Sequence, residues 1–280
     1  MRVTGVAKAA RGYDHHDHLC WAFDELGEFH SRVLEFLTDG LAQGQRACYA
    51  ATSDTAALWD DLRDLEETNR ARRPGAVQVQ SLDNRYVTGT VVDPVGRLQE
   101  ATAVTEDALG AGFTGLRLAC EAAPLMRTPE QLDAYVRFEH LIDRYMTSQP
   151  LSVLCAYNRV ELGEQTIAQV ACMHPATNDG AAPFRLHAST RAAASLGGDL
   201  DLASFDLFLM ALRWADLRPT GGELVIDATE LEFIDHRSLL ALAEHAWRCD
   251  ATAVLQTGLP STAQMIKVLD LADVRVEVPI

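Results

Sequence analysis

Alternating apolar and polar stretches along the first 157 residues predict strands separated by helices. In residues 21–45, apolar side chains recur at helical spacing, with Ala22, Leu26, Phe29 and Val33 on one face. Further helices are expected over 54–69, 93–110 and 128–148, and strands over 47–50, 77–82, 116–120 and 151–157. Strands that alternate with helices of this length predict an α/β fold, in which helices cover both faces of a mostly parallel sheet.

A short polar segment divides the chain. Residues 174–183, with the sequence HPATNDGAAP, are rich in turn-forming residues, and we interpret them as a linker. After it, strands are expected over 184–188, 192–196, 223–227, 253–256 and 274–278, and helices over 204–217, 238–249 and 262–271. We therefore predict two domains, residues 1–178 and residues 183–280, each within the usual size range.

The charge balance excludes several classes of partner. The 280 residues carry a net charge of −16, from 24 Lys and Arg against 40 Asp and Glu. Such a surface repels phosphate backbones and anionic lipids, so neither nucleic acid nor a membrane is an expected partner. The first residues lack the apolar run of a signal peptide, and no apolar stretch approaches the roughly 20 residues of a membrane span. Because the six cysteines form no CxxC pair, we favour a reducing compartment and predict a cytoplasmic protein.

The densest potential chemistry lies between Asp14 and Cys20, where three histidines stand among two aspartates. Histidine, cysteine and aspartate are all zinc ligands. However, His18 and Cys20 flank Leu19 as on a strand, which places both on one face, and no second group at ligand spacing completes a four-ligand set. We interpret His18 and Cys20 as satisfied buried residues or as part of a ligand-binding sensory pocket, and we predict neither a metal nor another cofactor.

Three charged residues form a second candidate site. Arg117 falls in a strand predicted to be buried, where a lone charge is costly unless it is paired. We favour a buried ion pair between Arg117 and Glu121 or Glu139, which would hold the strand to a helix. The alternative is an arginine that binds an anionic ligand at the ends of the strands.

Six motifs are spread over residues 11–178. They are His18-Leu19-Cys20, Phe36–Arg46 as F-L-x-x-G-L-x-x-G-x-R, Gly112–Arg117 as G-F-x-G-L-R with Glu121 after it, Phe138-Glu139, Leu154–Tyr157 and His174-Pro175. Together they resemble the MEDS domain, the methanogen/methylotroph sensory module. The resemblance implies a sensory domain related to degenerate RecA/KaiC-type nucleoside triphosphatases, which agrees with the α/β pattern.

A relationship to nucleoside triphosphatases raises the question of whether this chain has the motifs needed to hydrolyse a nucleotide. A phosphate-binding loop needs the pattern G-x-x-x-x-G-K-[ST]. Residues 23–31, before the first long helix, read FDELGEFHS with one glycine and three acids, and neither Lys8 nor Lys267 lies near them. The chain also holds no G-x-S-x-G, H-E-x-x-H or paired-carboxylate pattern typical of a hydrolase. We therefore predict that the protein is not an enzyme and has no catalytic residues.

Four short motifs follow one another along residues 183–280. They are Leu196–Asp201 as L-x-G-x-L-D, the apolar run Leu224–Asp227 ending in aspartate, Phe233–Asp235 as F-x-D, and Leu255–Leu259. Together they resemble the STAS domain of anti-sigma factor antagonists. The resemblance implies a small sheet with helices packed on one face.

The same resemblance draws attention to one loop. In the STAS family, the aspartate of a D-S-S/T-G-L motif opens a helix, and a partner kinase that also binds a sigma factor phosphorylates the next serine. Here the motif is Asp235-His236-Arg237-Ser238-Leu239, so His236 holds the phosphoacceptor position and the usual serine switch cannot operate there. Asp235 is expected to cap the helix. His236 and Arg237 stand where a positive charge would oppose the helix dipole, which indicates that they face an acidic patch on a partner or on the other domain. We therefore expect Asp235, His236, Arg237 and Ser238 to be partner-binding residues.

The two resemblances imply a bacterial, cytoplasmic signalling protein that regulates transcription, as in a stress response. We expect an anti-sigma factor antagonist or related partner-switching regulator whose partner is an anti-sigma factor or serine-kinase-like regulator. An unknown small-molecule signal and a homo-oligomeric state stay open. Two alternatives also remain, namely a nucleotide- or metal-dependent enzyme that uses the N-terminal domain, and a non-catalytic assembly scaffold.

Overall fold

The N-terminal part of the protein is built on a seven-stranded sheet. The computed structural model describes residues 2–70, 73–82 and 90–278. In this sheet the strand order is β1-β7-β2-β6-β5-β3-β4, and every neighbouring pair is parallel. The strands are β1 (Gly5–Ala7), β2 (His18–Phe23), β3 (Arg46–Ala51), β4 (Val77–Ser81), β5 (Leu116–Glu121), β6 (Leu151–Asn158) and β7 (Ala176–Asn178). The predicted parallel α/β architecture is confirmed.

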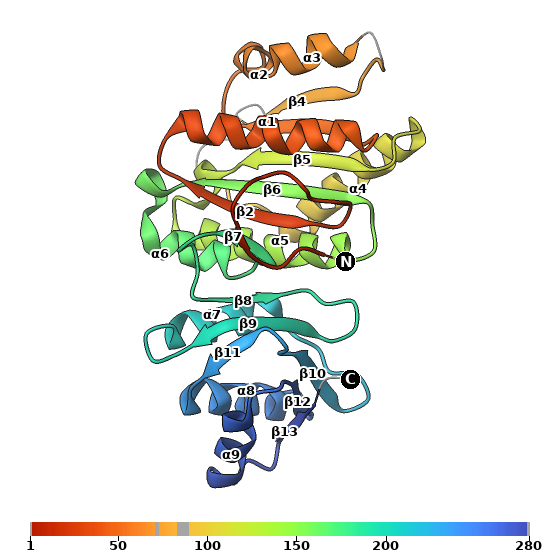
Figure 1. The fold of residues 1–280 in the computed structure, drawn as a ribbon. Helices are drawn as coiled ribbons and strands as arrows, with labels where there is room; N and C mark the ends of the chain where they lie inside the picture. The colour runs from red at the N-terminus through yellow and green to blue at the C-terminus, as the bar shows by residue number, and fades with distance from the viewer. Residues whose placement is uncertain (1, 71–72, 83–89, 279–280) are drawn as a thin grey trace.

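Helices cover both faces of this sheet (Figure 1). On one face lies α1 (Leu26–Ala42), which packs against β3 and β5. On the other lie α4 (Pro94–Gly110), α5 (Pro129–Met146) and α6 (Arg159–Ala171), and the short η1 (Ala123–Met126) contacts α5 and α6. Two further helices, α2 (Thr55–Asp61) and α3 (Arg63–Arg70), lie beside the outer strand β4.

Capping residues in the sequence explain where the helices α4 and α5 begin. Asp93 accepts hydrogen bonds from the backbone N–H groups of Val95 and Gly96, and Pro94 occupies the first turn of α4. At the start of α5, Thr128 and Gln131 form a reciprocal capping box that satisfies two backbone donors. Both helices were expected at these positions, and the caps account for their sharp starts.

Three sequence expectations for the first domain are wrong. Residues 21–23 belong to the buried strand β2, and α1 begins only at Leu26, because the apolar run around Trp21 fits a buried strand as well as a helix face. The expected helix over 54–69 is two helices that meet at Leu62. Residues 174–183, expected as a linker, contain β7, which pairs with both β1 and β2.

The C-terminal part contains a second, smaller sheet. Its order is β11-β9-β10-β12-β13, and β8 pairs antiparallel with β9. The strands are β8 (Phe184–His187), β9 (Ala194–Leu200), β10 (Glu223–Asp227), β11 (Leu231–Ile234), β12 (Thr252–Gln256) and β13 (Val274–Glu277). The helices are α7 (Phe205–Ala215), α8 (His236–Arg248) and α9 (Pro260–Val268). A small sheet with helices is thus present as expected, although β11 was not predicted and α8 begins two residues earlier than expected.

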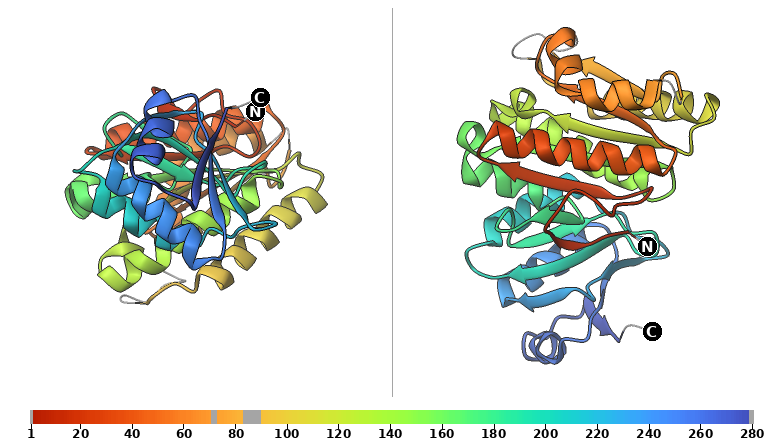
Figure 2. Two further views of the ribbon diagram at one scale, coloured as in Figure 1. Left: turned by 90° about the horizontal axis from the view of Figure 1, so that it is seen from below. Right: turned by 45° about the horizontal axis from the view of Figure 1, so that its top comes forward.

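The two parts pack closely against each other, with the smaller one beyond the β1–β7 edge of the large sheet (Figures 1 and 2). Helix α7 packs against α5 and α6, and the indole N–H of Trp214 donates to Asp133 at 2.9 Å. The apolar core between the large sheet and α4–α6 merges with that of the C-terminal part into one cluster of buried residues, while the core beneath α1 forms a second cluster. Among the described residues, no helix combines the length and apolar character needed to cross a bilayer.

Candidate functional site: a buried cluster of histidine, cysteine and carboxylate

Four side chains with metal-binding chemistry meet inside the first domain. In the parallel register of β2 and β6, His18 lies opposite Val153, so Cys155 points to the same face of the sheet two residues farther on. Glu139 comes from α5, which covers this face, and His174 comes from the turn after α6. All four side chains are buried, so their polar atoms need partners inside the protein.

The donor atoms of this cluster lie close together, all within 4.8 Å of one another. His18 Nε2 is 3.3 Å from Glu139 Oε2 and 3.4 Å from Cys155 Sγ. The Cys155 thiol lies 3.6 Å from the same Glu139 oxygen. His174 Nε2 is 3.5 Å from that oxygen, but it makes no hydrogen bond and is one of the few buried polar atoms in the described chain without one.

Each of three donors is oriented from behind by a second group. His18 donates through Nδ1 to Asp143 at 3.1 Å, and His174 donates through Nδ1 to the backbone carbonyl of Val170 at 2.9 Å. Glu139 accepts a hydrogen bond of 2.6 Å from the Tyr157 hydroxyl through its other oxygen. These contacts fix the imidazole rings so that both Nε2 atoms face the centre of the cluster.

Burial and mutual charge set the protonation of the cluster. Burial lowers the pKa of His18, but its hydrogen bonds to Asp143 and Glu139 outweigh that effect and raise the pKa above the usual value. Burial, together with the charge of His18, lowers the pKa of His174 to about 4. Burial raises the pKa of Glu139, but the hydrogen bond from His18 and the charges of the two imidazoles lower it overall to about 2. Burial also raises the pKa of the Cys155 thiol well above its usual value.

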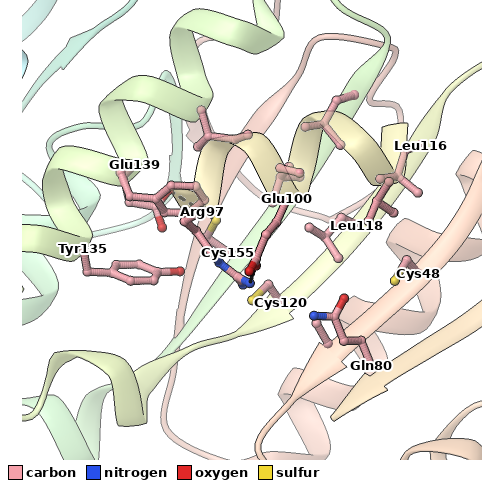
Figure 3. Close-up of a pocket in the computed structure, with 17 residues that line it drawn as sticks. Cys48, Gln80, Arg97, Glu100, Leu116, Leu118, Cys120, Tyr135, Glu139 and Cys155 are labelled. Carbon is pink, nitrogen blue, oxygen red and sulfur yellow. Dashed lines mark hydrogen bonds and ion pairs between the residues drawn. The ribbon is translucent and has the colours of Figure 1, made fainter. Parts of the chain in front are cut away.

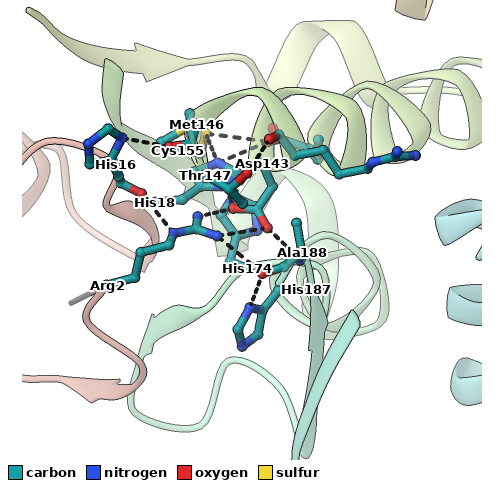
Figure 4. A network of polar contacts seen from close by, with 12 residues as sticks. Arg2, His16, His18, Asp143, Met146, Thr147, Cys155, His174, His187 and Ala188 are labelled. Atoms are coloured by element: carbon teal, nitrogen blue, oxygen red, sulfur yellow. Dashed lines mark hydrogen bonds and ion pairs between the residues drawn. The ribbon is translucent and has the colours of Figure 1, made fainter. Parts of the chain in front are cut away.

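Asp143 links the cluster to the second domain (Figure 4). Its Oδ1 accepts from His18 and from the guanidinium of Arg2, and its Oδ2 accepts from Arg2 and from the backbone N–H of Ala188 at 2.7 Å. Arg2 also donates to the carbonyls of His16 and Ala188. Burial raises the pKa of Asp143, but Arg2 and His18 outweigh it and hold the pKa well below its usual value. One carboxylate thus contacts both the cluster and the strand segment that begins the C-terminal part.

A small cavity adjoins the cluster on the α4 side (Figure 3). Its free space is about 50 Å³, and it lies between α4, α5 and the face of β3, β5 and β6 that these helices cover. Glu139 and Cys155 line it together with Cys48, Arg97, Cys120 and Tyr135. The same two donors therefore belong to both the cluster and the cavity wall.

The structure separates several residues that the sequence analysis grouped. Cys20 is buried on β2 itself, opposite Cys155, and shares the face of His18 as expected, but it is not among the four donors. The expectation that nothing completes a donor set around His18 is wrong, because Glu139, Cys155 and His174 come from distant parts of the chain. Glu121 does not join them, and instead accepts from Thr52 and from the backbone of Ala123.

The expected pairing of Arg117 with Glu121 or Glu139 is also wrong. Arg117 points to the opposite face of the sheet, toward α1, where it forms an ion pair of 2.9 Å with Asp39. Its other N–H groups donate to Ser152 and to the carbonyls of Phe36, Tyr13 and Asp14. Gly40 permits this arrangement, because a Cβ at that position would overlap the Arg117 side chain. Arg117 is thus paired in the core and is not aimed at an anionic ligand.

At the start of α8 the structure describes the loop singled out by the sequence. Asp235 caps the helix and accepts a hydrogen bond of 2.7 Å from the backbone N–H of Ser238, as expected. His236 and Arg237 are exposed, whereas Ser238 is fully buried. The guanidinium of Arg237 lies 5.2 Å from the centre of the Phe205 ring.

The family model described as MEDS, "MEthanogen/methylotroph, DcmR Sensory domain", matches residues 17–175, more than half of the chain. The chain belongs to the MEDS family. All four donors of the cluster lie inside the matched region, so they are part of the MEDS domain. The match ends at residue 175, and the STAS resemblance of the C-terminal part stays a prediction.

Other comparisons add little to the MEDS assignment. No curated protein matches the chain. Among solved structures, the flagellar accessory protein FlaH from Methanocaldococcus jannaschii is similar, with 12% sequence identity and a TM-score of 0.39. That alignment covers 62% of this chain and 71% of the FlaH chain. At so low a score, the description of the MEDS domain rests on its own strand order.

Proposed function

We propose that this protein is a cytoplasmic signalling protein and not an enzyme. In this proposal the MEDS domain senses a small-molecule signal, and the C-terminal domain acts like a STAS domain that binds an anti-sigma factor or serine-kinase-like regulator. Membership of a sensory family supports the first half. The second half rests on the resemblance of residues 183–280 to anti-sigma factor antagonists.

One set of contacts supports a link between sensing in the MEDS domain and partner binding by the C-terminal domain. Asp143 contacts His18 in the buried cluster and the backbone N–H of Ala188 in the C-terminal part. A change at the cluster that displaces His18 would disturb a carboxylate that also positions Ala188. Coupling of this kind needs two states with different contacts, and in this proposal the contacts of Asp143 are the ones that differ between them.

The start of α8 supplies a surface suited to a partner protein. His236 and Arg237 are exposed there, and Phe233 and Leu240 keep 46% and 43% of their surface exposed. Leu240 lies one helical turn after His236 and Arg237, so a cation and an apolar side chain share one face of α8, while Phe233 lies on the preceding strand β11. Arginine and aromatic side chains, such as Arg237 and Phe233 here, are enriched in protein–protein interfaces.

Arg237→Ala should weaken binding of the full chain to a cognate anti-sigma kinase by about tenfold or more. Loss of the guanidinium removes a positive charge from the surface, so it should also reduce the salt sensitivity of binding. His236→Ala should have the smaller effect. Titration at low and high salt measures both, with Arg248→Ala at the other end of α8 as the control. No complex with any cognate anti-sigma kinase would contradict the proposed function, and unchanged binding by Arg237→Ala would exclude this surface.

The loop should not accept phosphate from a serine kinase of this class. His236 holds the acceptor position, and the next hydroxyl, that of Ser238, is fully buried beneath the helix start. Intact-mass analysis after incubation with a cognate kinase and ATP should show no added phosphate. His236→Ser would place an exposed hydroxyl at the acceptor position and should make the chain a substrate. A stoichiometric phosphoserine at Ser238 in the original chain would contradict this prediction.

A further inference from the structure

The spacing of the buried donors matches the geometry of a four-coordinate metal site. A tetrahedron with metal–ligand bonds of 2.0–2.3 Å has edges of about 3.3–3.7 Å between ligand atoms. Four of the six edges in the cluster measure 3.3, 3.4, 3.5 and 3.6 Å. The remaining two, from His174 Nε2 to His18 Nε2 and to Cys155 Sγ, are at most 4.8 Å. A cation at the centre would therefore reach all four donors with small side-chain adjustments.

The unpartnered nitrogen of His174 points to a missing ligand. This histidine is fully buried, its Nδ1 already donates to Val170, and Nε2 has no hydrogen-bond partner. With Nδ1 protonated in a neutral ring, Nε2 carries a lone pair and no proton. A buried acceptor without a donor is costly, and a metal ion at the centre of the cluster would satisfy it.

The contacts behind the donors are those that accompany metal ligands in proteins. Ligating histidines usually donate their other ring N–H to a carboxylate or a backbone carbonyl, which fixes the ring. Here His18 donates to Asp143 and His174 to the Val170 carbonyl, while Tyr157 holds the second oxygen of Glu139. A chance meeting of four polar groups does not require three of them to be held in this orientation.

We propose that His18, Glu139, Cys155 and His174 bind one divalent transition metal ion, with Zn²⁺ as the preferred ion. The donors would be the Nε2 atoms of both histidines, the Cys155 thiolate and one Glu139 oxygen. Two imidazoles, one thiolate and one carboxylate are all zinc ligands, and the thiolate disfavours Mg²⁺ and Ca²⁺. Because the protein supplies all four ligands, no coordination position is left open, as in structural zinc centres. This proposal is independent of the proposed function.

The charge balance of the site is consistent with a divalent ion. Coordination requires Cys155 to lose its proton and His18 Nε2 to become a lone-pair donor. The thiolate and the carboxylate then offset the two positive charges of the ion. Asp143 stays paired with Arg2, so the added ion leaves no uncompensated charge in the core.

Metal binding can be measured on the full chain with Zn²⁺ and with Co²⁺, which reports its ligands through its visible spectrum. After incubation and desalting, elemental analysis should find one Zn²⁺ per chain. Co²⁺ should show the intense bands of a tetrahedral site and a thiolate-to-cobalt charge-transfer band. Cys155→Ser should abolish the charge-transfer band. It should also weaken binding by more than about 100-fold, which is the upper range for loss of a group that only hydrogen-bonds to a ligand.

A second set of variants separates coordination from folding. His174→Asn keeps a donor for the Val170 carbonyl at the position of Nδ1 and removes the Nε2 ligand, so it should weaken binding as strongly as Cys155→Ser. Tyr157→Phe removes only the hydrogen bond to Glu139 and should weaken binding by about tenfold. Cys172→Ser is the matched control, because Cys172 is equally buried and donates to the Gln169 carbonyl outside the cluster. It should bind Co²⁺ like the original chain, with the charge-transfer band intact.

Circular dichroism on each variant confirms that the chain is folded before binding is compared. The proposal is overturned if the folded original chain holds no stoichiometric Zn²⁺ or Co²⁺. It is also overturned if both Cys155→Ser and His174→Asn bind as tightly as the original chain. A charge-transfer band that persists in Cys155→Ser and disappears in Cys172→Ser would equally exclude this ligand set.

Discussion

Replacing Arg117 by methionine should lower the free energy of unfolding by about 3–5 kcal/mol. The side chain is fully buried and pairs with Asp39, and its remaining N–H groups satisfy Ser152 and three backbone carbonyls. Methionine fills much of the same space but donates nothing, so the Ser152 hydroxyl and the three backbone carbonyls lose a donor. Asp39 loses its ion-pair partner, although it is 27% exposed and still accepts from the Gly12 N–H. Urea unfolding followed by circular dichroism measures the change.

Arg137→Met provides the matched control for that experiment. Arg137 is an ion-paired arginine whose side chain keeps 39% of its surface exposed, and its partner Asp133 lies one helical turn away on α5. Exposed pairs of this kind contribute about 0–1 kcal/mol, so the control should change stability little. Equal effects in the two variants would contradict the assignment of Arg117 as a core-pairing residue.

Asp143→Asn should also lower the free energy of unfolding by about 3–5 kcal/mol, although the side chain keeps its size. Four donors converge on the two Asp143 oxygens, two from Arg2, one from His18 and one from the Ala188 backbone. An asparagine has one oxygen and one NH₂ group, so at least one of these donors would face another donor. The positive charge of Arg2 would also lose its buried partner.

The readout for Asp143→Asn should include the contact between the domains as well as stability. Loss of the Ala188 hydrogen bond should increase amide hydrogen exchange at Ala188 more than at β10 or β12, which are held by their own sheet. Glu130→Gln, an exposed substitution on the same helix α5, is the control. Asp143→Asn with unchanged stability and unchanged exchange at Ala188 would show that this carboxylate does not join the two parts.

Local patterns predicted most elements of the fold but not their exact ends. The capped helices α4 and α5 and the apolar strands β5 and β6 fall within one or two residues of their expected positions, because caps and apolar runs are local signals. Helix α6 was missed, and its kink at Gly163, where φ is 76°, interrupts the helical pattern. The strand β7 was hidden in a segment rich in turn residues, since only pairing with β1 and β2 makes it a strand.

The candidate site could be predicted only in fragments. The alternation His18-Leu19-Cys20 correctly placed His18 on a strand with its side chain on the face shared by Cys20. Nothing near Cys155 or His174 in the sequence pointed to His18, because the contact depends on parallel strand order and on the turn after α6. Asp143 and Tyr157 carry no local signal of their role either, and only the fold brings them to the cluster.

The position of β7 in the large sheet has a consequence for how the protein is made. This strand is the last of the seven to leave the ribosome, yet it lies between β1 and β2, which are the first. Until residues 176–178 have been synthesised, one edge of β2 has no strand beside it, and bare edges of apolar strands favour aggregation. A fragment that stops at residue 175, where the family match ends, would keep that edge bare permanently. Fragments designed to isolate the MEDS domain should therefore extend past Asn178.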